Sequence, residues 1–503
     1  MPNVIVVGAG MGGLAAAIEL RARGFDVLVV ERADAPGGKA ASVHVGGVSV
    51  DSGPTVLTMR WVFDEILARA NRSLDDLVAL EQARVIARHA WCDGSRLDLR
   101  ASIDESEREI VAFAGRAEGA RFRTFMARAR ATYEASRDVF MIAQRPTLRA
   151  LMRAKPLDLR MLVALDPFRS MWTALAKTFR DERLRQLFAR YATYCGASPF
   201  EAPATLNLVA HVEACGVWRV RGGISSLARA LEKVARDMGV AFRYGAEVAE
   251  VVGRERALGV RLANGEHERA DAVLLNADVA AVAGRAFGER AARAVHARSE
   301  PSLSAITWAV VGRARGLPLA HHTVLFSDDY RAEFDDLARR RAPRAPTIYV
   351  CAQDRGDDVV ELDDERFLIV MNAPATGDVP ARWSNDERVR CERAAFLTMK
   401  RCGLTIAPRS SAMTTPVEIA RRFPMTRGAL YGPRQRSALS PLRRHGAKTS
   451  FPGLYLAGGS VHPGPGVPMA ALSGRLAATQ IAADLRSIAP SSTADIVGTT
   501  SMA

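Results

Sequence analysis

VIVVGAGMGGLAAAIELRARGFDVLVVE, residues 4–31, is the stretch that decides the fold. The apolar run Val4 to Val7 predicts a short buried strand, the following GAGMGG predicts a tight loop, and LAAAIELRARG predicts a helix. Gly8 permits the turn, Gly10 lets the backbone approach a phosphate, and Gly13 lets the helix pack closely on the strand. A phosphate in this loop would meet the free backbone N–H groups at the helix N-terminus.

The same stretch continues into a second strand that ends in an acid. Gly24 ends the helix, DVLVV predicts the strand, and Glu31 follows where a carboxylate can accept hydrogen bonds from ribose hydroxyls. A glycine-rich loop by itself is weak evidence for a dinucleotide-binding site, since an unrelated turn can have the same composition. The order of strand, loop, helix, strand and acid indicates an α/β, Rossmann-like dinucleotide-binding domain.

The identity of the dinucleotide depends on the next residues, ERADAPGGKAAS (31–42). Gly37 and Gly38 bring more backbone close to a cofactor, although an ordinary turn is the alternative, and Lys39 supplies a positive charge near a phosphate. This continuation resembles the extended fingerprint of FAD-containing amine oxidases and related desaturases. The resemblance implies FAD and disfavours NAD.

A segment near the other end of the chain predicts a second half of the cofactor site. FPGLYLAGGSVHPGPGVPMAALSGRLAATQIAADL (451–485) indicates a strand ending near Ala457, a glycine and proline turn, and a helix beginning at the VP pair. A helix N-terminus directed at the N1 and C2 edge of a flavin would stabilise the charge of the reduced ring. A purely structural strand and helix is the alternative. The candidate cofactor contacts are Gly458, Gly459, Ser460, Val467 and Pro468.

Composition limits the remaining possibilities. With 503 residues, 48% of them hydrophobic, the chain can bury one large or two ordinary cores. The net charge of +14 favours anionic partners such as membrane surfaces, nucleic acids or phosphorylated cofactors. Six scattered cysteines predict neither a zinc site nor a disulfide framework, and fit a reducing cytoplasm. The strand at the start leaves no room for a leader, and no apolar run approaches the roughly 18–20 residues of a membrane span.

Strand and helix signals return in separate places and predict a domain built from three pieces. Between the pieces, basic helices and mixed strands indicate an inserted α+β substrate domain. The FAD-binding domain is expected at 1–65, 215–290 and 425–488, the substrate and membrane-associating domain at 66–214 and 291–424, and a disordered tail at 489–503.

The first insert carries apolar residues at helical spacing beside many arginines. A packed helical face is one interpretation, and a basic amphipathic surface on anionic lipid headgroups is the other. The residues concerned are Leu148, Leu151, Met152, Phe168, Trp172, Leu175 and Phe179.

Three internal segments carry a more specific resemblance. CGVWRVRGGISSLARAL (215–231), HHTVLFSDDYRAEF (321–334) and IYVCAQDR (348–355), with both ends of the chain, resemble the bacterial phytoene desaturase family of carotenoid desaturases. RYATYCGASPFEAPATLNLVAHVEACGVW (190–218) and GGSVHPGPGVPMAALSGRLAA (458–478) look most like the 1-hydroxycarotenoid 3,4-desaturases, also called methoxyneurosporene dehydrogenases.

That resemblance implies a reaction on a lipophilic acyclic carotenoid with 1-hydroxy or 1-methoxy substitution. A hydride would pass from C4 to flavin N5 and a proton would leave C3, while the protein aligns the polyene and keeps the site dry. The implied setting is the cytoplasmic face of a bacterial inner membrane, with peripheral contact. Oxygen and a quinone both stay open as the electron acceptor.

Few side chains stand out as catalytic candidates. His462, in the predicted flavin-facing turn, could hydrogen-bond the ring or relay a proton, or could simply fix the loop. His321 and His322 could lie in the active site or in the core. His211 and Glu213 have no role that their spacing assigns, and no metal site is expected.

Several other functions remain open from the sequence alone. A phytoene or other acyclic-carotene desaturase, or a carotene isomerase using reduced flavin, would share both motifs. An amine oxidase would also use FAD, but 6% aromatic content argues against its aromatic-lined site. A non-catalytic basic protein that binds nucleic acid is disfavoured, because the basic residues are dispersed and no basic and aromatic motif accompanies them.

Overall fold

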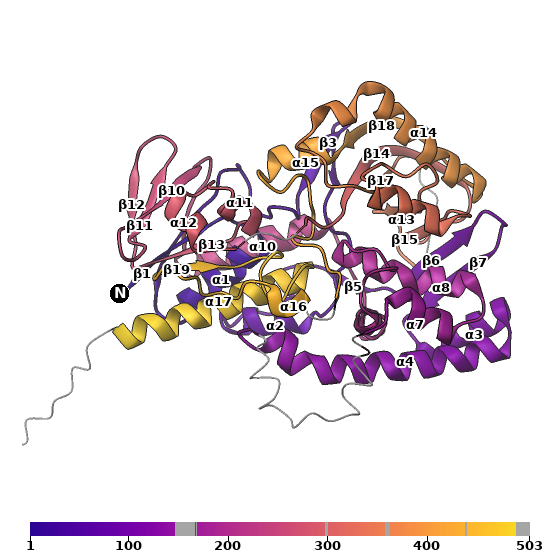
Figure 1. Ribbon diagram of the computed structural model, residues 1–503, viewed down its shortest axis with the longest axis horizontal. Helices are drawn as coiled ribbons and strands as arrows, with labels where there is room; N and C mark the ends of the chain where they lie inside the picture. The colour runs from indigo at the N-terminus through magenta and orange to yellow at the C-terminus, as the bar shows by residue number, and fades with distance from the viewer. Residues whose placement is uncertain (146–165, 167, 297–299, 358–362, 438–439, 489–503) are drawn as a thin grey trace, which may run out of the picture.

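The computed structural model describes residues 1–145, 166, 168–296, 300–357, 363–437 and 440–488 (Figure 1). The predicted disordered tail, 489–503, lies outside the described residues, and so do Leu148, Leu151 and Met152.

A parallel sheet of five strands forms one half of the molecule, and the N-terminal strand lies at its centre (Figure 1). Val4, Ile5 and Val6 are fully buried, as expected of a parallel strand that is covered on both faces. The predicted α/β class is confirmed by this sheet. Its strands, in spatial order, are β19 (Leu454–Leu456), β13 (Ala272–Leu275), β1 (Asn3–Val7), β2 (Asp26–Val30) and β9 (Ala241–Arg243).

Different structures cover the two faces of this sheet. Alternate residues of β1 belong to different cores: Val4 and Val6 pack with the helices, and Ile5 and Val7 pack toward a small antiparallel sheet. The helices are α1 (Met11–Ala22), α2 (Trp61–Ala68), α10 (Ile224–Asp237) and α17 (Val467–Ile488). The small sheet contains β10 (Val248–Val252), β11 (Gly259–Leu262) and β12 (His267–Arg269), beside α11 (Val279–Ala283) and α12 (Glu289–Arg293).

A mixed sheet of seven strands dominates the other half (Figure 1). Its strand order brings the two inserted segments together, because β15 pairs in parallel with β6. In order the strands are β18 (Leu404–Thr414), β14 (Ser304–Gly316), β17 (Glu365–Ala373), β16 (Ile348–Ala352), β15 (His322–Phe326), β6 (Val85–Trp91) and β7 (Arg96–Arg100).

Helices surround this sheet and connect it to the first. They are α3 (Ile103–Ala114), α4 (Arg116–Ser136), α7 (Met171–Thr178), α8 (Glu182–Ala189), α9 (Val209–Ala214), α13 (Tyr330–Ala338), α14 (Asn385–Arg401), α15 (Pro416–Arg422) and α16 (Ser440–Arg443). Shorter turns of helix are η1 (Arg137–Ile142), η2 (Arg190–Cys195), η3 (Ala204–Leu208) and η4 (Pro380–Trp383).

One strand pair and one hairpin make contacts across the expected domain boundaries. β5 (Leu80–Gln82) pairs with β8 (Trp218–Val220), and the hairpin of β3 (Ser42–Val45) and β4 (Val48–Asp51) contacts strands of the seven-stranded sheet. The two halves are therefore joined by more than the covalent connections. The domain boundaries themselves stay a prediction.

The apolar residues expected on one helical face separate into two groups. Leu175 and Phe179 are buried in the core beside α8, and Trp172 packs against the same core, which fits a packed face. Phe168 does not belong to that face: it precedes α7 and its side chain is 93% exposed.

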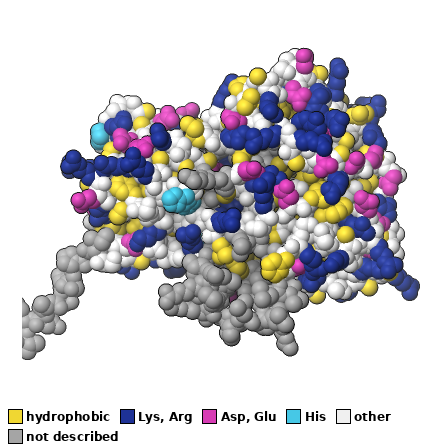
Figure 2. All heavy atoms as spheres, viewed as in Figure 1, with side chains coloured by type: hydrophobic (Ala, Val, Ile, Leu, Met, Phe, Trp, Pro, Cys, Tyr) yellow, Lys and Arg dark blue, Asp and Glu magenta, His cyan; other side chains and the backbone are white. Residues whose placement is uncertain are grey.

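The surface gives no sign of a single basic patch on the face in view. Figure 2 shows Lys and Arg spread over both halves and interleaved with Asp and Glu. Within the described part of the chain, no helix combines the length and the apolar character that a membrane crossing requires.

Candidate cofactor and substrate site

A cavity of about 1240 Å³ lies between the two halves of the molecule. It begins at the carboxyl ends of β1 and β2 and extends to β16 and β17, where Tyr349 and Leu368 contribute to its wall. Typical small-molecule pockets measure roughly 300–1000 Å³. The cavity therefore has room for a dinucleotide and for part of a second, elongated molecule.

The glycine loop after β1 lies at one end of this cavity and is tightly packed. A Cβ on Gly13 would lie 2.0 Å from the carbonyl oxygen of Gly8, so the close approach of helix to loop requires glycine there. A Cβ on Gly10 would lie 2.8 Å from Oδ1 of Asn276. No side chain caps the N-terminus of α1, which leaves its first backbone N–H groups available to an anion.

Glu31 follows β2 and shapes the same loop. Its Oε2 accepts a hydrogen bond from the Ala9 backbone N–H at 2.7 Å, and its Oε1 accepts one from Ala33 at 2.9 Å. Each oxygen retains a lone pair, so the carboxylate can still accept from ribose hydroxyls. Glu31 lines the cavity, as its predicted role requires.

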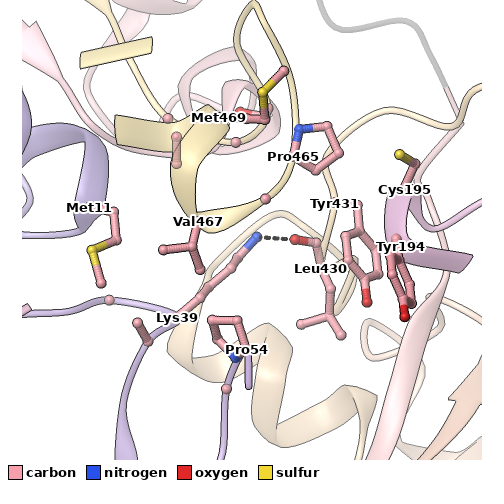
Figure 3. Close-up of a pocket in the computed structure, with 18 of the residues that line it drawn as sticks. Met11, Lys39, Pro54, Tyr194, Cys195, Leu430, Tyr431, Pro465, Val467 and Met469 are labelled. Atoms are coloured by element: carbon pink, nitrogen blue, oxygen red, sulfur yellow. Dashed lines mark hydrogen bonds between the residues drawn. The ribbon is translucent and has the colours of Figure 1, made fainter. Parts of the chain in front are cut away.

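The glycine pair and Lys39 continue the wall of the cavity. Gly37 N–H donates to the Ala9 carbonyl at 2.9 Å, so the second turn lies directly against the first. The Lys39 ammonium donates to the Leu430 carbonyl at 2.7 Å (Figure 3) and lies 4.0 Å from Oδ2 of Asp278. Burial lowers the pKa of Lys39, and the charge of Asp278 opposes that shift. The partners of this ammonium within the protein are thus a carbonyl and a carboxylate.

The C-terminal turn closes the cavity from the other side. β19 ends at Leu456, one residue before the predicted end near Ala457. α17 begins at Val467, as predicted. Gly458, Gly459, Ser460, Val467 and Pro468 all line the cavity. The hydroxyl of Ser460 accepts the backbone N–H of Val279 at 3.0 Å, so it also fixes the start of α11.

These residues fit FAD. The glycine loops form a cradle that side chains would fill, two helix N-termini open onto one cavity, and an acid stands beside the first loop. The adenine and ribose half would be held near Glu31, and the pyrophosphate at the N-terminus of α1. The turn before α17 would hold the flavin half.

His462 is placed behind this turn. Among the described residues that line the cavity, His462 is absent. Its Nε2 donates to the Ala143 carbonyl at 2.8 Å, its backbone N–H donates to the His445 carbonyl, and its ring is buried. Burial lowers the pKa of His462 to about 4. These contacts favour the loop-fixing interpretation over proton relay.

His321 and His322 lie beside the cavity in the seven-stranded sheet. His321 Nδ1 donates to the Arg355 carbonyl at 3.0 Å, and His322 Nδ1 lies 2.7 Å from the hydroxyl of Tyr349. Tyr349 lines the cavity, but the two imidazoles do not. Donor atoms of both histidines and Cys351 lie within 4.8 Å of one another, a spacing that a metal ion could share. Burial lowers the pKa of both histidines, to about 4 for His321.

A buried polar cluster lies in the mostly apolar wall, and no sequence pattern pointed to it. Arg190 pairs with Glu213, whose carboxylate also accepts hydrogen bonds from Tyr191 and Tyr194. Arg190, Tyr194 and Glu213 line the cavity. Glu213 received no role from its spacing because its partner is 23 residues away and meets it through the packing of η2 against α9.

Asn276 was also missed, although its position carries a signal. It follows β13 directly, and the carboxyl ends of parallel strands are where α/β sheets bind ligands. Its side chain lies against both glycine motifs. A Cβ on Gly12 would lie 2.7 Å from its Nδ2, and a Cβ on Gly458 would lie 2.8 Å from the same atom.

The chain is similar to known proteins over most of its length. The family described as flavin containing amine oxidoreductase matches residues 11–370. The chain is 48% identical to a hydroxyneurosporene desaturase of Rubrivivax gelatinosus, over 96% of this chain and 94% of that protein. It is 43% identical to a hydroxyneurosporene desaturase of Cereibacter sphaeroides, over 97% and 99%. Among solved structures, putrescine oxidase bound to putrescine shares the fold with a TM-score of 0.61 at 17% identity, over 97% of this chain and 99% of that one.

Proposed function

Because this chain belongs to the flavin containing amine oxidoreductase family and, within it, to the carotenoid desaturases, we propose that it introduces a C3–C4 double bond into an acyclic 1-hydroxy- or 1-methoxycarotenoid. The observation that carries the proposal is a single cavity that joins the two glycine cradles to a long apolar wall. The similarity to the two hydroxyneurosporene desaturases extends over nearly the whole chain and supports the same proposal.

The reaction removes a hydride from C4 and a proton from C3, and one carbon–carbon double bond forms. Bound FAD supplies the two-electron acceptor for the hydride. The residues of this chain hold the polyene in position and exclude water, since the wall contains mostly apolar side chains. The apolar lining residues that come just before Glu213 in the sequence are Leu206, Leu208, Val209 and Val212.

The polyene must enter from a lipid phase, and the cavity wall includes a residue suited to contact it. Phe168 both lines the cavity and exposes 93% of its side chain. Arg169 follows it, paired with Asp166. We propose that this exposed part of the cavity wall, called the cavity mouth below, contacts the membrane, with the protein peripheral to the cytoplasmic face of the inner membrane.

The test is to express the chain in cells that supply 1-hydroxyneurosporene, and to measure pigment mass and absorption. Loss of two hydrogens with a red shift is the expected result, because the new double bond lengthens the conjugated system. Unchanged 1-hydroxyneurosporene, together with conversion of phytoene in a parallel strain, would reassign the chain to phytoene desaturation. A colourless, flavin-free preparation would contradict both assignments.

A further inference from the structure

We propose that Arg190 and Tyr330 form the subsite that binds the oxygen atom on C1 of the carotenoid. This inference deepens the proposed function and rests on it, since it assigns the residues that select an oxygenated chain end. It concerns two side chains that come from distant parts of the sequence and line the same cavity.

Arg190 is held rigidly by its neighbours. Its Nη2 donates to Oε2 of Glu213 at 3.2 Å, and its Nη1 donates to the hydroxyl of Tyr194. The side chains of Arg190 and Glu213 are only 6% and 4% exposed. The Tyr194 hydroxyl donates in turn to Oε1 of Glu213 at 3.1 Å. The charge of the guanidinium is therefore compensated within the protein, and its orientation is fixed.

Two donors in this region have no acceptor among the described residues. Nε of Arg190 and the hydroxyl of Tyr330 are both buried and unpartnered. Both residues line the cavity. Burial and the negative charge of Glu333 hold the pKa of Tyr330 well above its usual value, and the positive charge of Arg190 opposes that shift. A buried donor without an acceptor destabilises the site, and an oxygen from the ligand would relieve that cost.

The chemistry of the pair selects an acceptor. A guanidinium N–H can only donate, and a tyrosine hydroxyl can rotate to donate. An ether oxygen and an alcohol oxygen each offer the lone pairs that these donors need, so the subsite accepts both a methoxyl and a hydroxyl group. A hydrocarbon end offers none and would leave both donors buried without a partner.

The position of the cluster agrees with the reacting carbons. C1 is two bonds from C3, so an oxygen bound here keeps C3 and C4 at this end of the cavity. This end of the cavity is close to the turn before α17. A Cβ on Gly196, which ends the η2 segment that carries Arg190, would lie 2.4 Å from the ring of Tyr431. A Cβ on Gly432, the next residue after Tyr431, would lie 2.7 Å from Cβ of Ser460 in that turn. Figure 3 shows Tyr194 and Tyr431 on this wall, beyond the contact between Lys39 and Leu430.

The experiment compares Tyr330→Phe and Arg190→Lys with the wild type. For each holoenzyme, KM is measured with 1-hydroxyneurosporene, and Ki is measured with neurosporene, which has no oxygen, as competitor. Tyr330→Phe removes a hydroxyl without a protein partner and keeps the ring, which packs against Phe326 and Phe334. Arg190→Lys keeps the charge but replaces the whole guanidinium, so it removes Nε together with the Nη contacts to Tyr194 and Glu213, and Tyr330→Phe is the cleaner of the two variants. Tyr244→Phe is the matched control, because Tyr244 does not line the cavity among the described residues.

The wild type should bind the hydroxylated carotenoid more tightly than neurosporene. We expect Tyr330→Phe to reduce the ratio of Ki to KM about fivefold or more, and Arg190→Lys to reduce it about tenfold or more. Tyr244→Phe should leave the ratio unchanged. If Tyr330→Phe and Arg190→Lys both keep the wild-type ratio while turnover persists, the subsite is wrong and the desaturase function stands. If the wild type does not desaturate 1-hydroxyneurosporene, the proposed function itself fails.

Discussion

The side-chain amide of Asn276 lies so close to Gly10 that a Cβ on Gly10 would come within 2.8 Å of its Oδ1. The first glycine motif is therefore shaped by a residue 266 positions further along the chain as well as by the cofactor.

Gly10→Ala should weaken FAD binding at least about tenfold, because the new methyl group must displace Asn276 from the space between the glycine loops. Titration of the apoprotein with FAD, followed by flavin fluorescence, measures the Kd. Gly356→Ala is the control, since its Cβ would meet no atom closer than 3.6 Å. Equal Kd values for both variants and the wild type would show that this packing does not control the cofactor site.

Lys39→Met should also weaken FAD binding, by about tenfold, if the ammonium contributes a charge to the cofactor as proposed. The protein partners of Lys39 are Leu430 and Asp278, so the variant leaves that carboxylate uncompensated as well. The Kd for FAD at low and high salt measures the effect. Lys177→Met, on α7, is the control. An unchanged Kd together with impaired carotenoid turnover would assign Lys39 to the substrate side of the cavity.

Breaking the buried ion pair of Arg355 and Glu365 should destabilise the seven-stranded sheet. Their side chains are 2% and 0% exposed and are joined by two hydrogen bonds of 2.5 and 2.6 Å. Glu365→Leu leaves the guanidinium unpaired, so we expect a loss of about 3–5 kcal/mol in the free energy of unfolding. Urea denaturation provides the measurement. The double variant Arg355→Met, Glu365→Leu should recover most of that loss, and failure to recover would point to a packing defect instead.

Acid should destabilise the protein through His462. Burial lowers its folded-state pKa to about 4, whereas the unfolded side chain titrates near 6.5. Between these values the unfolded chain binds the proton first, so stability is fully present above pH ~6.5 and falls as the pH drops toward 4, by up to about 3 kcal/mol. His462→Gln should reduce the slope of the unfolding free energy against pH in this range without abolishing it, because burial also lowers the pKa of His89, His321 and His322. His44→Gln, at an exposed position, should leave it unchanged. A wild-type slope in His462→Gln would assign the loss to other groups.

Phe168→Ser should weaken binding to vesicles of phosphatidylglycerol and phosphatidylethanolamine about tenfold, because a large exposed apolar side chain is lost from the cavity mouth. Cosedimentation at fixed salt measures the effect. Leu397→Ser changes a residue of α14 that is 58% exposed and does not line the cavity, and it should bind vesicles like the wild type. Equal losses in both variants would place the membrane contact elsewhere.

The sequence predicts local features of this site well and long-range ones poorly. The strand, loop and helix at residues 4–31 were expected because their signals are contiguous, and the start of α17 was placed at Val467 by its glycine and proline turn. The cofactor, the α/β fold and the family were likewise predicted, and they are confirmed. The role of Asn276 depends on β13 pairing with β1, which no local pattern encodes.

Polar groups buried by tertiary packing were hardest to predict. Glu213 looked like one acid among many, since its three partners come from η2, a different element. Phe168 followed a helical spacing, but the helix begins only at Met171, so the spacing was coincidental. His462 attracted attention by its place in the flavin turn, whereas its ring is directed to the Ala143 carbonyl.

The order of strands in the parallel sheet has a consequence for biosynthesis. β19 pairs with β13, and α17 packs on α1, so the last strand and helix described complete a site that the first strand begins. A chain still held by the ribosome cannot form this site before residues 454–488 have emerged. Both halves of the FAD cradle can therefore be present only after residues 454–488 have left the ribosome, and until then the loop after β1 lacks the turn that faces it.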